Sequence, residues 1–218
     1  MTQAIAQQRK AAQTGLRVIW CAVALIFIWS AVRPHDYFTW MLEVFPAIIG
    51  AVILAVTYRR FRFTTLVYTL IALHMIILMV GGHYTYAEVP IGNWIRDHLQ
   101  LSRNHYDRLG HFAQGFVPAM IAREVLLRLN VVKRGRWLFA LIASVCLAVS
   151  SLYELLEWIV SALTGSAGDA FLGTQGDVFD TQKDMALALA GAVTSLLLLS
   201  RLHDRQLGDA ADHGDQQA

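Results

Sequence analysis

The chain has 218 residues, of which 56% are hydrophobic and only 16% are charged. A soluble globular domain carries about 25% charged residues, so this composition excludes an ordinary soluble protein and is typical of a membrane protein. The formal net charge of +2 is the average of two faces of opposite sign. The basic residues are scattered over several short loops without an aromatic platform or groove motif, which argues against a nucleic-acid-binding protein. Cys21 and Cys146 lie inside apolar stretches and are interpreted as packing residues.

Six segments approach the roughly 20 apolar residues needed to cross about 30 Å of hydrocarbon. Each is predicted to be a transmembrane helix: Leu16 to Val32, Trp40 to Thr57, Thr64 to Gly82, Leu109 to Leu129, Trp137 to Val160, and Thr181 to Leu202. The first could instead be a signal peptide, but it is long for one and its cleavage motif is poor, so we expect a retained helix. The predicted fold class is therefore all-α, a polytopic bundle of six transmembrane helices.

The predicted transmembrane domain covers residues 16–205. The flanking residues 1–15 and 206–218 have too few large apolar side chains to pack, and we expect disordered tails. Arginine and lysine gather in the N-terminal tail, the second and fourth connections and the C-terminal tail, which places both termini in the cytoplasm. The carboxylates gather at the opposite, outer end of the helices.

Two outer connections are longer than a helix bundle needs. The third, from His83 to Asp107, has apolar residues at helical spacing, which predicts a short helix lying at the membrane interface; they are Ile91, Trp94, Ile95 and Leu99. The fifth, from Thr164 to Gly176, is rich in glycine but lacks the pattern of a phosphate-binding P-loop.

The fourth predicted helix carries Asp107, His111 and Gln114 on one face, at i, i+4 and i+7. An aspartate and a histidine one turn apart suit a divalent cation or a carboxylate-oriented imidazole. The alternative is a helix-start carboxylate, favoured by the helix dipole, with His111 hydrogen-bonded nearby. Pro118 frees the carbonyl group of Gln114 as a further acceptor, although it could also serve only as a kink.

Carboxylates also line the outer ends of the fifth and sixth predicted helices. Glu154 and Glu157 are neighbours on one face, and two such groups in a low dielectric need a cation or a shared proton unless arginine pairs with them. Asp177 or Asp180 could cap the last helix, whereas Asp184 lies one turn further in and is harder to explain as a cap. Below Asp184, small residues predict close approach of another helix; they are Ala188, Gly191 and Ser195.

Other polar residues have simpler explanations. His74 is interpreted as a hydrogen-bonded core histidine, and Glu124 is expected to pair with Arg128 four residues later. Four helices nevertheless supply imidazole or carboxylate groups at one level, which predicts a shared site for zinc, manganese or iron. The expected metal ligands are His83, Asp107, His111, Glu157, Asp180 and Asp184, with Glu154 as general base, Gln114 positioning substrate, and His35, Asp36 and Glu43 as possible extra ligands.

Several sequence strings carry a resemblance to a known family; they are TWMLEVFP, MVGGHYTYAEVP, SRNHYDRLGHFAQG, IAREVLLR, YELLEW and FLGTQGDVFDTQKDM. From Arg33 to Arg205 the chain resembles the YjdF family of bacterial inner-membrane proteins, a domain of unknown function. That resemblance implies a multi-pass protein of the bacterial inner membrane. YELLEW and DTQKD followed by Gly191 are similar to VanZ-like membrane proteins, which implies envelope or lipid-linked chemistry, although the asparagine of that pattern is absent here.

Three functions compete for this pattern. The first is a metal-dependent, hydrolase-like membrane enzyme whose site at the periplasmic face acts on a lipid-linked or phosphorylated substrate. The second is an ion- or proton-coupled transporter that uses the same groups. The third is a non-catalytic envelope assembly factor in which the carboxylates serve helix docking. In all three the lipid bilayer is the expected surrounding.

Overall fold

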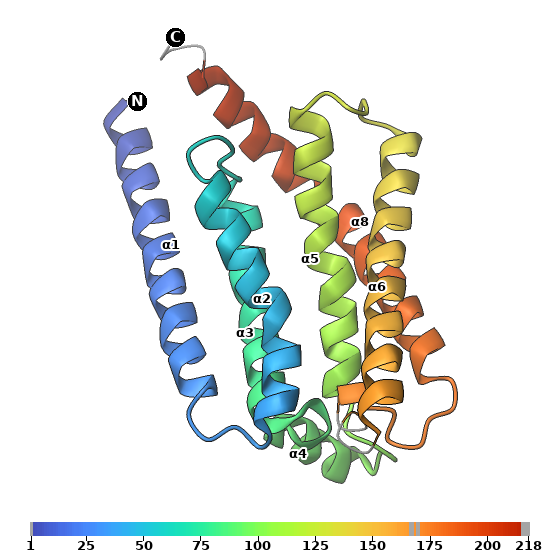
Figure 1. Ribbon diagram of the computed structural model, residues 1–218. Helices are drawn as coiled ribbons and strands as arrows, with labels where there is room; N and C mark the ends of the chain where they lie inside the picture. The colour runs from blue at the N-terminus through green and yellow to red at the C-terminus, as the bar shows by residue number, and fades with distance from the viewer. Residues whose placement is uncertain (1, 166–167, 169–170, 215–218) are drawn as a thin grey trace.

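The computed structural model describes residues 2–165, 168 and 171–214, and within these it contains helices and no β-strand. The elements are α1 (Thr2–Ser30), α2 (Tyr37–Thr57), α3 (Thr65–Tyr84), the short 3-10 helix η1 (Tyr86–Glu88), α4 (Pro90–Leu99), α5 (Tyr106–Arg128), α6 (Arg136–Thr164) and α8 (Asp180–Gly214). The longer helices run alongside one another, while α4 lies at one end of the bundle (Figure 1). The all-α prediction is confirmed.

Four of these helices are long and apolar enough to cross a membrane. They are Tyr37–Thr57, Thr65–Tyr84, Arg136–Thr164 and Asp180–Gly208, whose most apolar windows have a mean hydropathy of 1.8 to 2.0. The apolar part of α1, Thr14–Ser30, is shorter, and α5 is not apolar enough because it carries Arg123 and Glu124 in its second half. Six spans and cytoplasmic termini therefore stay predictions, although α1 begins and α8 ends at the same end of the bundle (Figure 1).

Helix α5 lies inside the bundle, where it packs against α3, α6 and α8. Its closest neighbour is α8. A Cβ atom on Gly115 would overlap the Ala188 carbonyl group, and one on Gly191 would overlap the Phe112 carbonyl group, so the two helices touch through their backbones. The close approach predicted from the small residues of the last helix is confirmed, and it brings Asp184 level with the start of α5.

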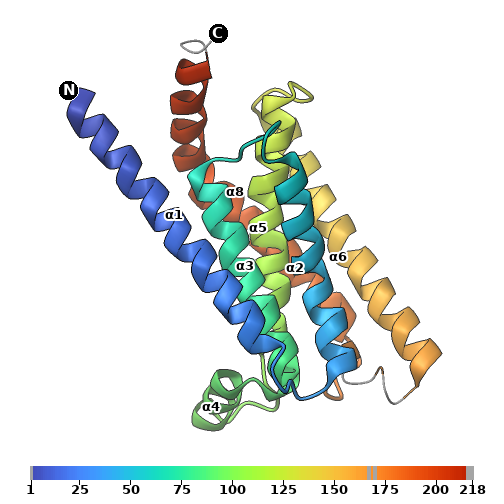
Figure 2. The same cartoon turned by 60° about the vertical axis from the view of Figure 1, so that its left-hand side comes forward.

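Helices α1 and α2 both pack on α3, and α3 packs on α5. In Figure 2 α3 lies between α1 and α5. Asp36 caps the start of α2 by accepting a hydrogen bond from the Thr39 amide at 2.6 Å, and this bond lowers the pKa of the Asp36 carboxyl group. Thr64 caps α3 in the same way. The buried core between these helices consists of aliphatic and methionine side chains, including Val44, Met79 and Met120.

The interface helix expected in the third connection is α4. It begins with Pro90 at its first position and exposes Ile91, Trp94 and Leu99, while Gly92 lies directly against the Asn104 side chain. Helix α1 begins at Thr2 and α8 continues to Gly214, inside the ranges expected to be tails, and whether those ends are disordered stays a prediction. Part of the glycine-rich fifth connection, residues 166–167 and 169–170, lies outside the described residues.

Candidate metal centre

His111 is the centre of a buried cluster of acids at the end of the bundle that carries α4. Only 5% of its surface is exposed. Its Nε2 atom lies 3.5 Å from an oxygen of Asp107, one turn earlier on α5, and its Nδ1 atom lies 3.5 Å from an oxygen of Glu154 on α6. The imidazole therefore has a carboxylate on each side, one from its own helix and one from a neighbour.

Two further acids complete the cluster. Asp184 comes from α8 and Glu157 from α6, one turn after Glu154, and both are buried. These residues form two groups, and inside each group the possible ligand atoms all lie within 4.8 Å of one another. The first group is Asp107, His111 and Asp184, and the second is His111, Glu154 and Glu157. The structure thus brings together five of the eight residues predicted for the site, from three helices.

Polar atoms in and around the cluster are buried without a hydrogen-bond partner among the described residues. They are His111 Nδ1, Gln114 Oε1, Glu154 Oε1, Asp184 Oδ1 and the hydroxyl groups of Ser150 and Tyr153. Each such group costs about 1 to 3 kcal/mol if it stays unpaired. The arginines at this end do not pair with either glutamate in the described part of the chain, so the salt-bridge alternative does not account for Glu154 and Glu157.

A cavity of about 200 Å³ adjoins the cluster on the side of α2 and α3. Gln114, the residue predicted to position substrate, lines it together with His111 and Glu157. His74 also lines this cavity, and its Nε2 atom is buried without a hydrogen-bond partner in the described structure. The interpretation of His74 as a hydrogen-bonded core histidine is therefore wrong for this nitrogen.

Two further residues line that cavity: Glu43, expected from the sequence only as a possible extra ligand, and Tyr86, which the sequence did not single out. Glu43 of α2 is 5% exposed, and Tyr86 of η1 is 6% exposed. The Tyr86 ring is fixed between Gly81 and Gly110, where any Cβ atom would collide with it. Burial raises the pKa of the Tyr86 phenol well above its ordinary value, with the Glu43 charge as a further cause, so the hydroxyl group stays protonated and can donate a hydrogen bond.

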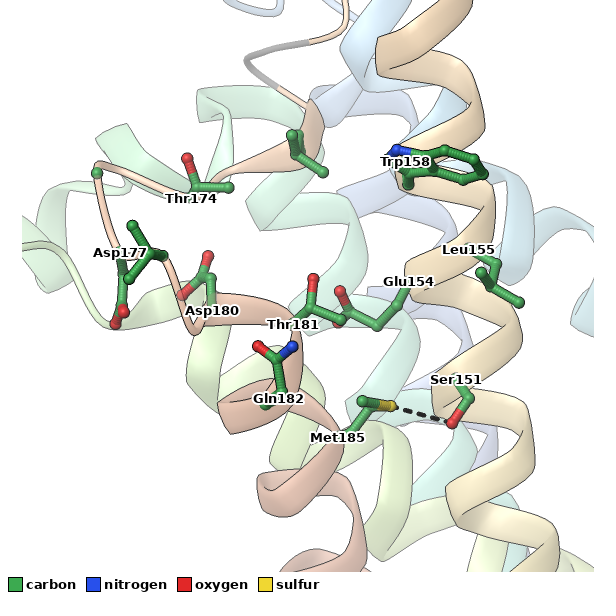
Figure 3. A pocket seen from close by; sticks show the side chains of 13 residues that line it. Ser151, Glu154, Leu155, Trp158, Thr174, Asp177, Asp180, Thr181, Gln182 and Met185 are labelled. Carbon is green, nitrogen blue, oxygen red and sulfur yellow. Dashed lines mark hydrogen bonds between the residues drawn. The ribbon is translucent and has the colours of Figure 1, made fainter.

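A larger cavity of about 640 Å³ lies on the other side of the cluster, between α6, the start of α8 and the preceding loop (Figure 3). Of the five clustered residues, only Glu154 lines it. Figure 3 shows Glu154 and Thr181 on facing helices with their polar ends toward one another. The rest of the exposed wall is mostly apolar, through Leu155, Trp158, Leu172, Val178 and Met185, and it also includes polar side chains, among them Asp177 and Asp180.

Asp180, a predicted ligand, does not join either group and instead pairs with Arg103. Arg103 is only 5% exposed and is held by the backbone carbonyl groups of Gly173 and Thr174 at 3.2 and 3.0 Å. It also lies 3.5 Å from Asp107. A protein cation therefore occupies the position at Asp180 that the sequence assigned to a metal, and the structure favours a positioning role for this aspartate.

Asp177 lies at the surface of the same region and also has protein cations as partners. Its carboxylate is 2.6 Å from the Lys183 ammonium group and 2.8 Å from the Arg108 guanidinium group. The hydrogen bond from Lys183 is the first cause that lowers the pKa of Asp177. The acid therefore stays ionised at neutral pH and anchors the loop before α8.

His83 is the other predicted ligand that the structure keeps apart from the cluster, because it belongs to neither group of ligand atoms among the described residues. Its ring lies 4.2 Å from the Trp29 ring, and its Nδ1 atom is 3.1 Å from the Ser30 carbonyl oxygen. Its own carbonyl group accepts a hydrogen bond from the His35 amide. His83 thus connects the end of α3 to the end of α1.

A second buried polar network connects α5 to α8 at the opposite end of the bundle. Glu124 is fully buried and accepts hydrogen bonds from the Thr64 amide and hydroxyl groups, from Arg128 at 3.0 Å and from His203 Nε2 at 2.9 Å. The predicted Glu124–Arg128 pair is confirmed. His203, which the sequence did not single out, lies just beyond the predicted end of the last helix and was missed for that reason.

The rest of that network is also paired. Arg123 contacts His203 Nδ1 at 3.0 Å and donates to both oxygens of Asp204 at 2.9 Å. Since a guanidinium group can only donate, His203 Nδ1 must accept, which leaves Nε2 protonated and donating to Glu124. Arg134 adds a second contact to Asp204 at 2.9 Å.

Comparison with known proteins agrees with this membrane architecture. The chain is 53% identical over 186 residues to a protein of Escherichia coli K12 named inner membrane protein YjdF, which covers 85% of this chain and 88% of the relative. No solved structure matches the chain. The matches bear out the YjdF resemblance and the expected inner-membrane location but lend no support to the VanZ-like similarity. Residues 15–205 match the family model described as predicted membrane protein DUF2238, and the chain belongs to that family.

Proposed function

We propose that the protein is a metal-dependent membrane enzyme that hydrolyses a phosphorylated, lipid-linked substrate at the acidic end of the bundle. The carrying observation is the buried His111 cluster, in which four carboxylates surround one imidazole. A low-dielectric site of this charge needs a cation or shared protons. Mixed imidazole and carboxylate ligands suit zinc, manganese or iron.

The first group, Asp107, His111 and Asp184, is our choice for the primary ligand set. In this arrangement His111 binds through Nε2, the nitrogen that faces Asp107, and its Nδ1–H faces Glu154. A carboxylate behind a metal-bound imidazole fixes the tautomer and increases the basicity of the ligand. Glu157 belongs to the second group, together with His111 and Glu154, and Glu43 is a buried carboxylate on α2.

The two cavities support an amphipathic substrate. An acyl or isoprenoid chain fits the larger cavity, whose wall is apolar beside Trp158 and Met185, and its phosphate group would then lie at Glu154. A bound metal would polarise the phosphate group as a Lewis acid. Water in the larger cavity, which Glu154 lines, would attack phosphorus as the bond from phosphorus to the lipid alcohol breaks. Glu154 would take the proton from that water and return it to the leaving alcohol, while Gln114 would contact the substrate from the smaller cavity.

Phosphate release tests this proposal. Purified protein in nanodiscs that contain phosphatidic acid should release inorganic phosphate when supplied with manganese or zinc. Glu154→Gln should reduce the rate by about 100-fold or more, the usual contribution of a general base. Glu88→Gln removes an exposed carboxylate of the same end and is the matched control. Metal-loaded wild-type protein that releases no more phosphate than empty nanodiscs would contradict hydrolysis of this lipid phosphate.

A second candidate function is cation-coupled transport. It is favoured by the smaller cavity, which extends from the cluster toward His74 on α3. In proteoliposomes with a pH-sensitive dye inside, a transporter should move protons or solute, and His74→Leu should abolish the movement. Hydrolysis without such movement would favour the enzyme.

A further inference from the structure

A separate cavity of about 700 Å³ lies at the end of the bundle opposite the His111 cluster. It lies between α1 and α2, and residues at the start of α3 close it. Both α1 and α2 pack on α3, and residues of all three helices line the cavity, which is thus a groove between α1 and α2. The proposed enzyme does not use this cavity, because its residues belong to other parts of the helices than those of the site.

The lining of this cavity is cationic at its mouth. Arg17 of α1 and Arg62 before α3 both line it, both are exposed, and no carboxylate is among the lining residues. Within the described structure neither guanidinium group forms an ion pair with an acid. Arg62 instead lies over the Tyr58 ring, 4.9 Å from its centre. Two guanidinium groups at one cavity favour an anion with several oxygen atoms, above all a phosphate.

The deeper part of the cavity is aromatic and aliphatic. Trp20 and Tyr68 meet edge to face at 6.4 Å, Phe63 packs on Tyr68 at 6.0 Å, and Leu54 lies beside them. Aromatic rings with a polar edge are enriched at the level of lipid headgroups. A ligand that satisfies both parts has an anionic head and an apolar chain, and it enters from the bilayer.

We infer that this groove binds an anionic glycerophospholipid, with its phosphate between Arg17 and Arg62 and one acyl chain along Leu54 and Trp20. A lipid bound there would fill the space between α1 and α2 and hold both helices on α3. Each basic residue close to an anionic lipid contributes about 1 kcal/mol, which corresponds to roughly a fivefold change in affinity.

Native mass spectrometry of the full chain released from detergent tests this inference. Phosphatidylglycerol should bind at least about fivefold more tightly than phosphatidylcholine. The double variant Arg17→Gln/Arg62→Gln should lose about tenfold or more in affinity for phosphatidylglycerol. Arg59→Gln/Arg60→Gln removes two exposed arginines of the same loop that do not line the cavity, and it should bind like the wild-type protein.

Two further measurements distinguish a lipid phosphate from free phosphate and control for misfolding. Millimolar inorganic phosphate should leave phosphatidylglycerol binding unchanged, whereas effective competition would identify a soluble anion and overturn the lipid proposal. Leu54→Trp fills the apolar part without changing charge and should weaken both lipids in protein that remains monodisperse. Equal affinity for the two lipids, or equal losses in the two arginine variants, would overturn the inference.

Discussion

Two buried clusters connect α5 to α8, and each contains a histidine and acids. In the inner cluster, at the end of the bundle where α1 begins, Glu124 and His203 are both fully buried, and every acid has a protein cation or hydrogen-bond donor as partner. In the outer cluster, at the end that carries α4, His111 has acids on both sides, and several polar atoms around it have no hydrogen-bond partner in the described structure. The same residue types thus form a structural clamp at one end and an incomplete ligand set at the other.

The difference follows from where the arginines are. Arg123, Arg128 and Arg134 contribute three guanidinium groups to the inner network, which more than offset the charge of its two carboxylates. At the outer end Arg103 pairs with Asp180 and reaches Asp107 only at 3.5 Å. Burying a charge is costly unless it is paired, so a cluster of four carboxylates with a single guanidinium group at its edge is the better candidate for a bound cation.

The largest expected effect is at the inner cluster. Glu124→Ala leaves the Thr64 amide group, His203 and Arg128 without their shared acceptor, and we expect a loss of about 3 to 5 kcal/mol in the free energy of unfolding. Chemical unfolding in detergent measures this loss. Glu88→Ala, at an exposed position, should change stability little. A loss of less than about 1 kcal/mol for Glu124→Ala would mean that the network is not a clamp.

Added metal should stabilise the folded protein, and it should do so only by binding at the outer cluster. Zinc or manganese at about 100 times its dissociation constant should raise the free energy of unfolding by about 2.7 kcal/mol. His111→Ala should abolish this gain, because it removes the residue that both ligand groups share. A thermal-shift series over metal concentration measures the effect, and an equal shift in His111→Ala would assign the binding to another place.

The backbone contact between α5 and α8 should matter next. Gly191→Ala places a methyl group against the Phe112 carbonyl group, which should cost about 1 to 3 kcal/mol and weaken metal binding by moving Asp184 away from His111. Gly208→Ala, on the same helix with open space around it, is the matched control and should be neutral or slightly stabilising. Equal stability of both variants, measured by thermal unfolding, would contradict the close contact.

One substitution should have opposite signs in the two clusters. Without metal, Asp184→Asn removes one of the mutually repelling acids and should be neutral or stabilising by about 1 kcal/mol. Asp204→Asn removes the partner of Arg123 and Arg134 and should destabilise the protein. Unfolding of both variants in a chelator provides the comparison. Destabilisation by both to the same extent would mean that the outer acids are paired after all.

The smallest effect is expected at the surface pair of Lys183 and Asp177. Lys183→Gln should change stability little at neutral pH, because the lysine side chain is 48% exposed. The lysine lowers the pKa of Asp177 in the folded state, so its contribution is present above the ordinary aspartate pKa of about 4 and is lost as the pH falls through the lowered value. Unfolding curves of the two proteins should therefore converge in acid. A difference that grows in acid would contradict this sign.

Much of the fold was predictable because hydropathy and small-residue spacing act locally. The apolar segments mark α2, α3 and α6 to within a few residues, and Gly191 indicated the contact that α8 makes. The end of the last helix was placed too early, at Leu202, because polar residues follow there. In the structure the helix continues, and those polar residues, His203 and Asp204, face arginines of α5.

The candidate site was predictable only in part. Helical spacing placed Asp107 beside His111 and Glu154 beside Glu157, but it could not tell which acids an arginine would neutralise. Arg103 reaches Asp180 across 77 positions of sequence, a contact that no local pattern indicates. His83 lies at the end of α3 near the cluster, but its ring packs on Trp29 instead of facing the clustered acids. The signal that could have found Tyr86 is the pair Gly81 and Gly110, which makes room for its ring.

Elemental analysis of the detergent-purified protein tests the central claim most directly. After loading with zinc or manganese and removal of unbound metal, the wild-type protein should retain metal in near-stoichiometric amount. His111→Ala should lose it, and His83→Ala should retain it, because the structure places only the first histidine among the clustered acids. Metal-free wild-type protein, or equal metal content in wild type and His111→Ala, would contradict a metal centre at His111.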